Sequence, residues 1–184
     1  MSAQPVPAAR RHLPNALTIV RFAAIPVFVA LYADAGDGGA WGAGVVFAAA
    51  AATDQLDGWL ARRWHVESGF GKVADPLADR LMIGVAVILL WADGRLPWPA
   101  VVIVLSRDLL LIAGYKLVVA RGYEFEVTAL GKLATWILYF SLGCVIVTQK
   151  GTDWPLVLFW AGVGLAVAAG VQYLVKARRE LRRG

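Results

Sequence analysis

Six apolar segments follow one another along the chain, and their lengths restrict the folds that it can adopt. A membrane-spanning helix needs about 20 mostly apolar residues. Because 59% of the 184 residues are hydrophobic, we expect an all-α integral membrane protein, with the six-transmembrane-helix domain in residues 14–176. Residues 1–13 then form an N-terminal segment and residues 177–184 a basic tail. The predicted spans are residues 14–33, 39–61, 72–93, 96–120, 130–149 and 154–176.

Lysine and arginine are distributed unevenly between the two predicted sides of the membrane. One side carries Arg10, Arg11, Arg62, Arg63, Lys72, Arg121, Lys132, Lys176, Arg178, Arg179, Arg182 and Arg183. The other side carries only Arg95 and Lys150, beside Asp34, Asp37, Asp93 and Asp153. Cytoplasmic segments are the ones enriched in these cations. We therefore expect both termini on the cytoplasmic side of the cell (plasma) membrane, in a multi-pass protein.

The net charge of +5 does not indicate a nucleic-acid partner, because the cations recur between apolar runs and form no single patch. The tail KARRELRRG suits anionic membrane lipids, although topology alone also explains it. The single cysteine, Cys144, excludes an internal disulfide and most metal-thiolate sites. The N-terminus lacks a small-residue cleavage site after a short apolar core, so we predict no signal peptide.

Two pairs of aspartates lie at the cytoplasmic ends of the second and third spans, in DQLDGWLARRWHVESGFGKVADPLAD. Asp54 and Asp57 are three residues apart, and Asp75 and Asp79 are four apart. Either spacing puts both side chains on one face of a helix. The charge-free run from Leu81 to Ala92 is too short to cross a bilayer, so the third span must include acids.

Each aspartate at a bilayer centre costs roughly 2.5–3.5 kcal/mol, so the four acids need partners. Divalent metal ions are the natural partners of clustered carboxylates. The alternative is a set of structural ion pairs with Arg62, Arg80 and Lys72, which explains the cations but not the paired spacing.

Paired divalent ions beside cations and glycines suit phosphate chemistry. The metals would neutralise diphosphate oxygens, and one carboxylate would take a proton from an attacking hydroxyl. Gly58 and Gly71 would let the backbone approach a ligand, and Arg62 would bind phosphate. His12 and His65 are too few for a zinc site. The chain also has no GxxxxGK[ST] loop and no G-x-S-x-G elbow.

The pattern D-G-x2-A-R-x8-G-x3-D-x3-D is complete in this chain, and Asp54 adds an acid three residues before it. The pattern is met by Asp57, Gly58, Ala61, Arg62, Gly71, Asp75 and Asp79. On these residues the chain resembles the CDP-alcohol phosphatidyltransferases over nearly its whole length. The resemblance implies a six-helix membrane bundle, usually a homodimer, with its site open to the cytoplasm. It also implies transfer of a phosphatidyl group from CDP-diacylglycerol with loss of CMP.

The resemblance also implies roles for individual residues. Asp54, Asp57, Asp75 and Asp79 would bind two Mg²⁺ or Mn²⁺ ions, and Asp79 would also deprotonate the acceptor hydroxyl. The residues that would contact the CDP-lipid are Asn15, Thr18, Gly58, Ala61, Arg62, Ser68 and Gly71.

The acceptor is a finer question. P-N-x-L-T-x-x-R at residues 14–21 and the ending QYLVKARREL resemble the glycerol-accepting branch. That branch includes phosphatidylglycerophosphate synthases, which use glycerol 3-phosphate, and CMP-forming cardiolipin synthases, which use phosphatidylglycerol. Two features favour the cardiolipin type. One is the stretch SRDLLLIAG, and the other is GKLAT, which lacks the second lysine of the G-K-x-K-T pattern of phosphatidylglycerophosphate synthases. Fewer cations suit the phosphodiester of phosphatidylglycerol, which carries a single negative charge. Arg107 and Lys132 would bind the acceptor phosphate in either case.

Four further charges interrupt the predicted spans: Arg21, Arg107, Asp108 and Lys116. Such groups face a cavity or one another. Because Arg107 and Asp108 are adjacent, they cannot lie on one helix face, and at least one needs a partner on another helix. Arg107 then either lines the site or joins a helix–helix ion pair.

A divalent-cation transporter is the alternative from another class, because intramembrane acids also mark ion pathways. It predicts acids spread through the membrane depth, often in inverted repeats. Here the four aspartates lie near one side and no repeat is visible. A non-catalytic scaffold requires none of these acids.

Overall fold

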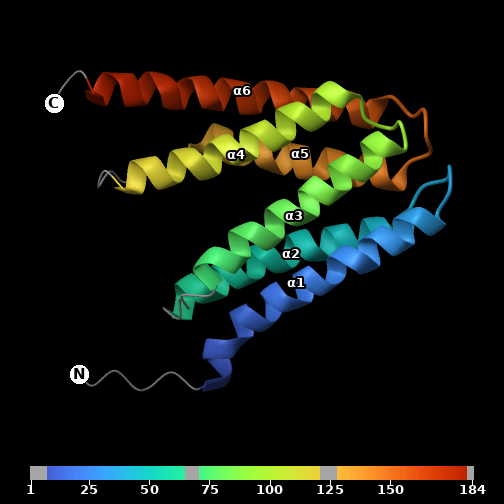
Figure 1. The fold of residues 1–184 in the computed structure, drawn as a ribbon, viewed down its shortest axis with the longest axis horizontal. Helices are drawn as coiled ribbons and strands as arrows, with labels where there is room; N and C mark the ends of the chain where they lie inside the picture. Colours follow the sequence, from blue (N-terminus) through green and yellow to red (C-terminus); the bar gives the residue numbers. More distant parts are fainter. Residues whose placement is uncertain (1–7, 65–70, 121–127, 182–184) are drawn as a thin grey trace. The chain divides into compact units, whose positions relative to one another are not determined.

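The computed structural model describes residues 8–64, 71–120 and 128–181, and every regular element within these ranges is an α helix (Figure 1). The elements are α1 (Ala8–Asp34), α2 (Trp41–Trp64), α3 (Gly71–Ala92), α4 (Trp98–Ala120), α5 (Ala129–Val147) and α6 (Trp154–Leu181). The all-α prediction is confirmed for this part of the chain.

Two helix ends lie more than three residues outside the predicted bounds. The first helix begins at Ala8, before Pro14, and the last continues to Leu181, beyond residue 176. The predicted spans followed the apolar segments, which begin at about residue 14 and end at about residue 176. The residues before Pro14, AARRH, and those that end α6, KARREL, are mostly good helix formers. Both helices therefore extend past their apolar segments.

Among the residues whose side chains the structure describes, three segments are long and apolar enough to cross a membrane: Ala16–Asp34, Ala129–Val147 and Trp154–Gln172. The described apolar parts of α2 and α3 are shorter, at Trp41–Thr53 and Arg80–Ala92. Large apolar side chains are also exposed on the helices, for example Leu110 at 70% and Phe140 at 66%. Helices that are apolar both inside and outside are typical of a membrane environment.

One compact unit contains α1, α2 and α3 up to Leu89, together with Ile146–Thr148. The ring of Phe28 on α1 lies 6.1 Å from that of Tyr32 and 6.0 Å from that of Phe47 on α2, measured between centroids. The backbone N–H of Ala40 donates to the carbonyl of Ile146 at 2.9 Å. A Cβ at Gly39 would lie only 1.9 Å from the carbonyl oxygen of Val147, so this close approach requires glycine.

The second unit contains α4, α5 and α6 and the end of α3 from Leu90. Its buried residues recur at helical spacing, as Ala134, Leu138 and Leu142 do on α5. Phe159 on α6 is fully buried. Gly162 on α6 lies close against Leu138, because an added Cβ would be 3.0 Å from its Cγ.

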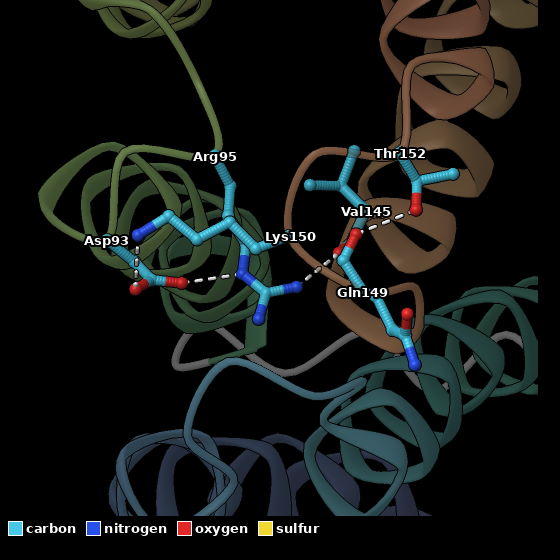
Figure 2. A network of polar contacts seen from close by, with 6 residues as sticks. All are labelled: Asp93, Arg95, Val145, Gln149, Lys150 and Thr152. Carbon is cyan, nitrogen blue, oxygen red and sulfur yellow. Dashed lines mark hydrogen bonds and ion pairs between the residues drawn. The ribbon is translucent and has the colours of Figure 1, made fainter.

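A polar network joins the α3–α4 turn to the α5–α6 turn within the second unit (Figure 2). Arg95 Nε donates to Asp93 Oδ2, and Arg95 Nη1 lies 3.5 Å from the carbonyl oxygen of Val145. Lys150 Nζ lies 3.6 Å from Asp93 Oδ1. The two cations that the sequence assigns to the far side of the membrane therefore share one carboxylate. We call Asp93, Arg95 and Lys150 the turn clasp.

Candidate active site

The four aspartates of the motif lie on two consecutive helices, as the same-face argument requires. Asp54 and Asp57 are on α2, and Asp75 and Asp79 are on α3. Residues 65–70 join the end of α2 to the start of α3, so each pair lies within a few turns of that link. The side chains of these aspartates lie outside the described part of the structure. Their assembly into a metal site stays a prediction.

The donor set fits the implied metal in its chemistry. Mg²⁺ and Mn²⁺ prefer oxygen ligands, and two carboxylate pairs on neighbouring helix segments supply only oxygen. Among the side chains that the structure does describe, no group of three or more His, Cys, Asp or Glu residues is placed to hold a metal ion. The motif aspartates, whose side chains lie outside that part, stay the predicted ligands.

The predicted CDP-lipid residues are distributed over α1, α2 and α3. Gly58, Ala61 and Arg62 are on α2, and Gly71 is the first residue of α3. Their side-chain surroundings, and the side chain of Asn15 on α1, lie outside the described part, as does Ser68 altogether. The structure therefore places these residues on helices without testing their contacts.

The structure describes the surroundings of two predicted residues of α1: Thr18, a predicted CDP-lipid contact, and Arg21, a predicted intramembrane charge. They are three residues apart and fully buried, with 0% and 1% of their surfaces exposed. A buried charge is far more costly in lipid than among protein groups. This burial agrees with the expectation that Arg21 faces the protein interior. A ligand that contacts Thr18 would have to reach into the packed face of α1.

Arg107 joins α4 to α5. Its Nη2 donates to Thr135 Oγ1 at 2.7 Å, and its Nη1 donates to Asp108 Oδ1 at 3.1 Å. The interaction with Thr135 confirms that one of these charged neighbours needs a partner on another helix. Adjacent positions do not share a helix face, but the arginine side chain is long enough to reach the neighbouring aspartate as well. Among the described residues, the ion pair of Arg107 lies within α4 and does not join two helices.

The N-terminal turn of α5 carries the second predicted acceptor residue, Lys132, whose side chain is exposed. Thr128 caps this helix, because the N–H of Gly131 donates to Thr128 Oγ1 at 3.2 Å. The N-terminus of a helix carries a partial positive charge, which favours anions. Lys132 and the helix end therefore make this turn electropositive, one turn before Thr135.

Sequence reasoning did not identify Thr135 as a functional residue. The available signal was its place in GKLAT, where it follows Gly131 by four residues, one helical turn. The other predicted intramembrane cation of α4, Lys116, has a side chain outside the described part. Asp108 is 8% exposed, which agrees with an interior position.

Comparisons with known proteins agree with the motif. The family model for CDP-alcohol phosphatidyltransferase matches residues 11–168. A "Probable phosphatidylglycerophosphate synthase" of Mycobacterium tuberculosis is 35% identical over 181 residues, covering 92% of this chain and 83% of that protein. A "Cardiolipin synthase (CMP-forming)" of Streptomyces coelicolor is 34% identical over 183 residues, covering 92% of this chain and 84% of that protein.

A third relative, from Bacillus subtilis, is named "CDP-diacylglycerol--glycerol-3-phosphate 3-phosphatidyltransferase". It is 30% identical over 185 residues, covering 90% of this chain and 94% of that protein. The relatives' names thus include both acceptors that the sequence left open. The family is membrane-bound, generally depends on divalent cations, and uses CDP-diacylglycerol with an alcohol acceptor. Motif, helices and relatives agree: this chain is an enzyme of phospholipid biosynthesis and belongs to the CDP-alcohol phosphatidyltransferase family.

Proposed function

We propose that this enzyme transfers the phosphatidyl group of CDP-diacylglycerol to a hydroxyl of phosphatidylglycerol, releasing CMP and forming cardiolipin. The observation that carries the donor half is the complete aspartate motif on α2 and α3. The acceptor half rests on the charges around Arg107 and Lys132.

The four motif aspartates would hold two divalent ions, Mg²⁺ or Mn²⁺. When bound, the ions supply charge neutralisation at the diphosphate and at the leaving phosphate. Gly58 and Gly71, which have no Cβ, allow close approach to the nucleotide, and Arg62 binds a phosphate oxygen. Asn15, Thr18, Ala61 and Ser68 complete the predicted CDP-lipid contacts.

Asp79 acts as the general base in this proposal. It takes the proton of the acceptor hydroxyl as that oxygen forms a bond to the phosphorus of the phosphatidyl group. The bond from this phosphorus to the oxygen that it shares with the cytidine monophosphate breaks, and CMP leaves with the electron pair. Asp79 therefore has two tasks, since it is also one of the proposed metal ligands.

The charge balance near the acceptor residues favours phosphatidylglycerol. The positive charge of Arg107 is offset by Asp108, at 3.1 Å. Lys132 is exposed, and the ion pairs of the described residues do not include it. Counted over the described side chains, this leaves one net positive charge, which suits a phosphodiester with one negative charge better than a phosphomonoester with nearly two. Glycerol 3-phosphate is the second candidate, because two of the relatives above carry phosphatidylglycerophosphate synthase or glycerol-3-phosphate transferase names.

For the membrane arrangement we propose six spans in residues 14–176, both termini and the site in the cytoplasm, and a homodimer in the plasma membrane. Trp91, Trp98 and Trp154 support the far interface. They lie at the ends of α3, α4 and α6 beside the turn clasp and are 49%, 66% and 50% exposed. Tryptophan is enriched at membrane interfaces. The topology is tested with single-cysteine variants in a Cys144→Ser background. A membrane-impermeant maleimide added outside the cell should label Asp37→Cys and leave Arg183→Cys unlabelled. Chemical cross-linking in the membrane tests the homodimer.

The function is tested with the purified enzyme, CDP-diacylglycerol and each acceptor separately, in the presence of Mg²⁺ or Mn²⁺. The readouts are CMP release and the identity of the lipid formed. Cardiolipin formed only with phosphatidylglycerol supports the proposal, and product formed only with glycerol 3-phosphate replaces it by the second candidate. Metal flux into vesicles without CMP release would instead favour the transporter.

A further inference from the structure

The hydroxyl of Thr135 has both of its hydrogen-bonding roles assigned. It donates to the carbonyl of Gly131 at 2.9 Å and accepts from Arg107 Nη2 at 2.7 Å. The hydroxyl has a single proton, and the bond to Gly131 uses it. A lone pair is therefore left for the guanidinium, and the acceptor atom is held by the backbone of α5.

The guanidinium of Arg107 is thereby held at two points. One is Thr135 on α5, and the other is Asp108 on its own helix. A free arginine side chain has up to about 2 kcal/mol of rotamer entropy to lose when it binds a ligand. These two hydrogen bonds, one to a residue of α4 and one to a residue of α5, restrict the rotation of the side chain before a ligand binds. Of the five N–H groups of a guanidinium, these two bonds occupy two, and three remain for another acceptor atom.

We infer that Thr135 is a positioning residue for the acceptor: it fixes the guanidinium of Arg107 so that its remaining N–H groups bind the acceptor phosphate. The inference rests on the proposed role of Arg107. Thr135 itself touches no reacting atom. The chemical class that it helps to select is an alcohol that carries a phosphate group, whether that phosphate is part of a lipid or of a small molecule.

The test compares Thr135→Val, which keeps the branched shape and removes the hydroxyl, with Thr135→Ser, which keeps the hydroxyl. Loss of one charge-assisted hydrogen bond corresponds to about a tenfold effect. We expect Thr135→Val to raise the KM for the acceptor about tenfold, with the KM for CDP-diacylglycerol and kcat within about twofold of wild type. Thr135→Ser should restore the acceptor KM.

Ser141→Ala is the matched control. Ser141 lies on the same helix and donates to the carbonyl of Leu138 at 2.8 Å, so its loss removes a similar bond. It should leave all three kinetic constants unchanged. A double-mutant cycle adds a second test, because Thr135→Val should have no further effect on acceptor KM in an Arg107→Gln background if it acts only through Arg107. If Thr135→Val does not fold, Thr135→Ala removes the same hydroxyl and takes its place.

The outcomes separate the two proposals. If Arg107→Gln raises the acceptor KM and Thr135→Val does not, the positioning role is wrong and the role of Arg107 stands. If Thr135→Val lowers kcat and raises both KM values together, its role is structural and the inference is overturned. If Arg107→Gln leaves the acceptor KM unchanged, the acceptor half of the proposed function fails, and the inference fails with it.

Discussion

Asp93 supplies the carboxylate of the turn clasp, and its removal is expected to destabilise the protein. Most of this effect should come from the lost contact with the buried Arg95, and very little from the lost contact with the exposed Lys150. The side chain of Arg95 is 3% exposed and that of Lys150 is 44% exposed, although both contact Asp93. Breaking a buried ion pair by removing one partner costs about 3–5 kcal/mol, because a charge is left uncompensated. An exposed pair contributes about 0–1 kcal/mol.

These magnitudes set the expected results for two variants. Asp93 is itself 28% exposed, and Arg95 keeps its contact with the carbonyl of Val145, so the cost should be smaller than for a fully buried pair. Asp93→Ala should lower the free energy of unfolding by about 1–3 kcal/mol, while Lys150→Ala should change it by less than about 1 kcal/mol. The assay is unfolding of the detergent-solubilised protein by increasing denaturant, followed by circular dichroism. Asp93 follows the last residue of α3, whereas Asp75 and Asp79 belong to the first half of that helix. The folded fraction of each variant should therefore keep its specific CMP release.

Equal effects of Asp93→Ala and Lys150→Ala would refute the reasoning, since burial would then not decide the contribution of the pair. A cost below about 1 kcal/mol for Asp93→Ala would show that water solvates Arg95 in the folded protein.

Three further predictions concern the site and the helix contacts. Asp79→Asn should lower the rate of CMP release by at least about 10²-fold without loss of helical signal, because it removes the proposed base; wild-type turnover by this variant would exclude that role. Chelation with EDTA should abolish CMP release, and Mg²⁺ or Mn²⁺ should restore it; activity that survives exhaustive chelation would contradict the metal site. Gly39→Ala should destabilise the protein by about 1–3 kcal/mol, because its Cβ would lie 1.9 Å from the carbonyl oxygen of Val147. Gly164→Ala, with nothing within 4 Å of its Cβ, is the matched control and should be neutral or slightly stabilising.

The helices could be predicted from the sequence because the signals that define them are local. Long apolar runs separated by polar links place all six helices. The pairing of Asp54 with Asp57 and of Asp75 with Asp79 on one helix face follows from their spacing once each pair lies on a helix. The family could be predicted for the same reason, since its motif is a set of residues at fixed offsets along the chain. The ends of α1 and α6 were missed because helix propensity extends them past the apolar boundaries that a span prediction follows.

The pairing of side chains from different helices could not be predicted in this way. The contact of Arg107 with Thr135 joins residues 28 positions apart, and that of Arg95 with Val145 joins residues 50 apart. Such contacts depend on how each helix is rotated and where it crosses its neighbour, and periodicity within one helix does not contain that information. The sequence by itself determined the helical membrane class, the motif and the family. Only the tertiary structure decided which polar groups hold Arg107 and Arg95, because those partners meet through packing between helices.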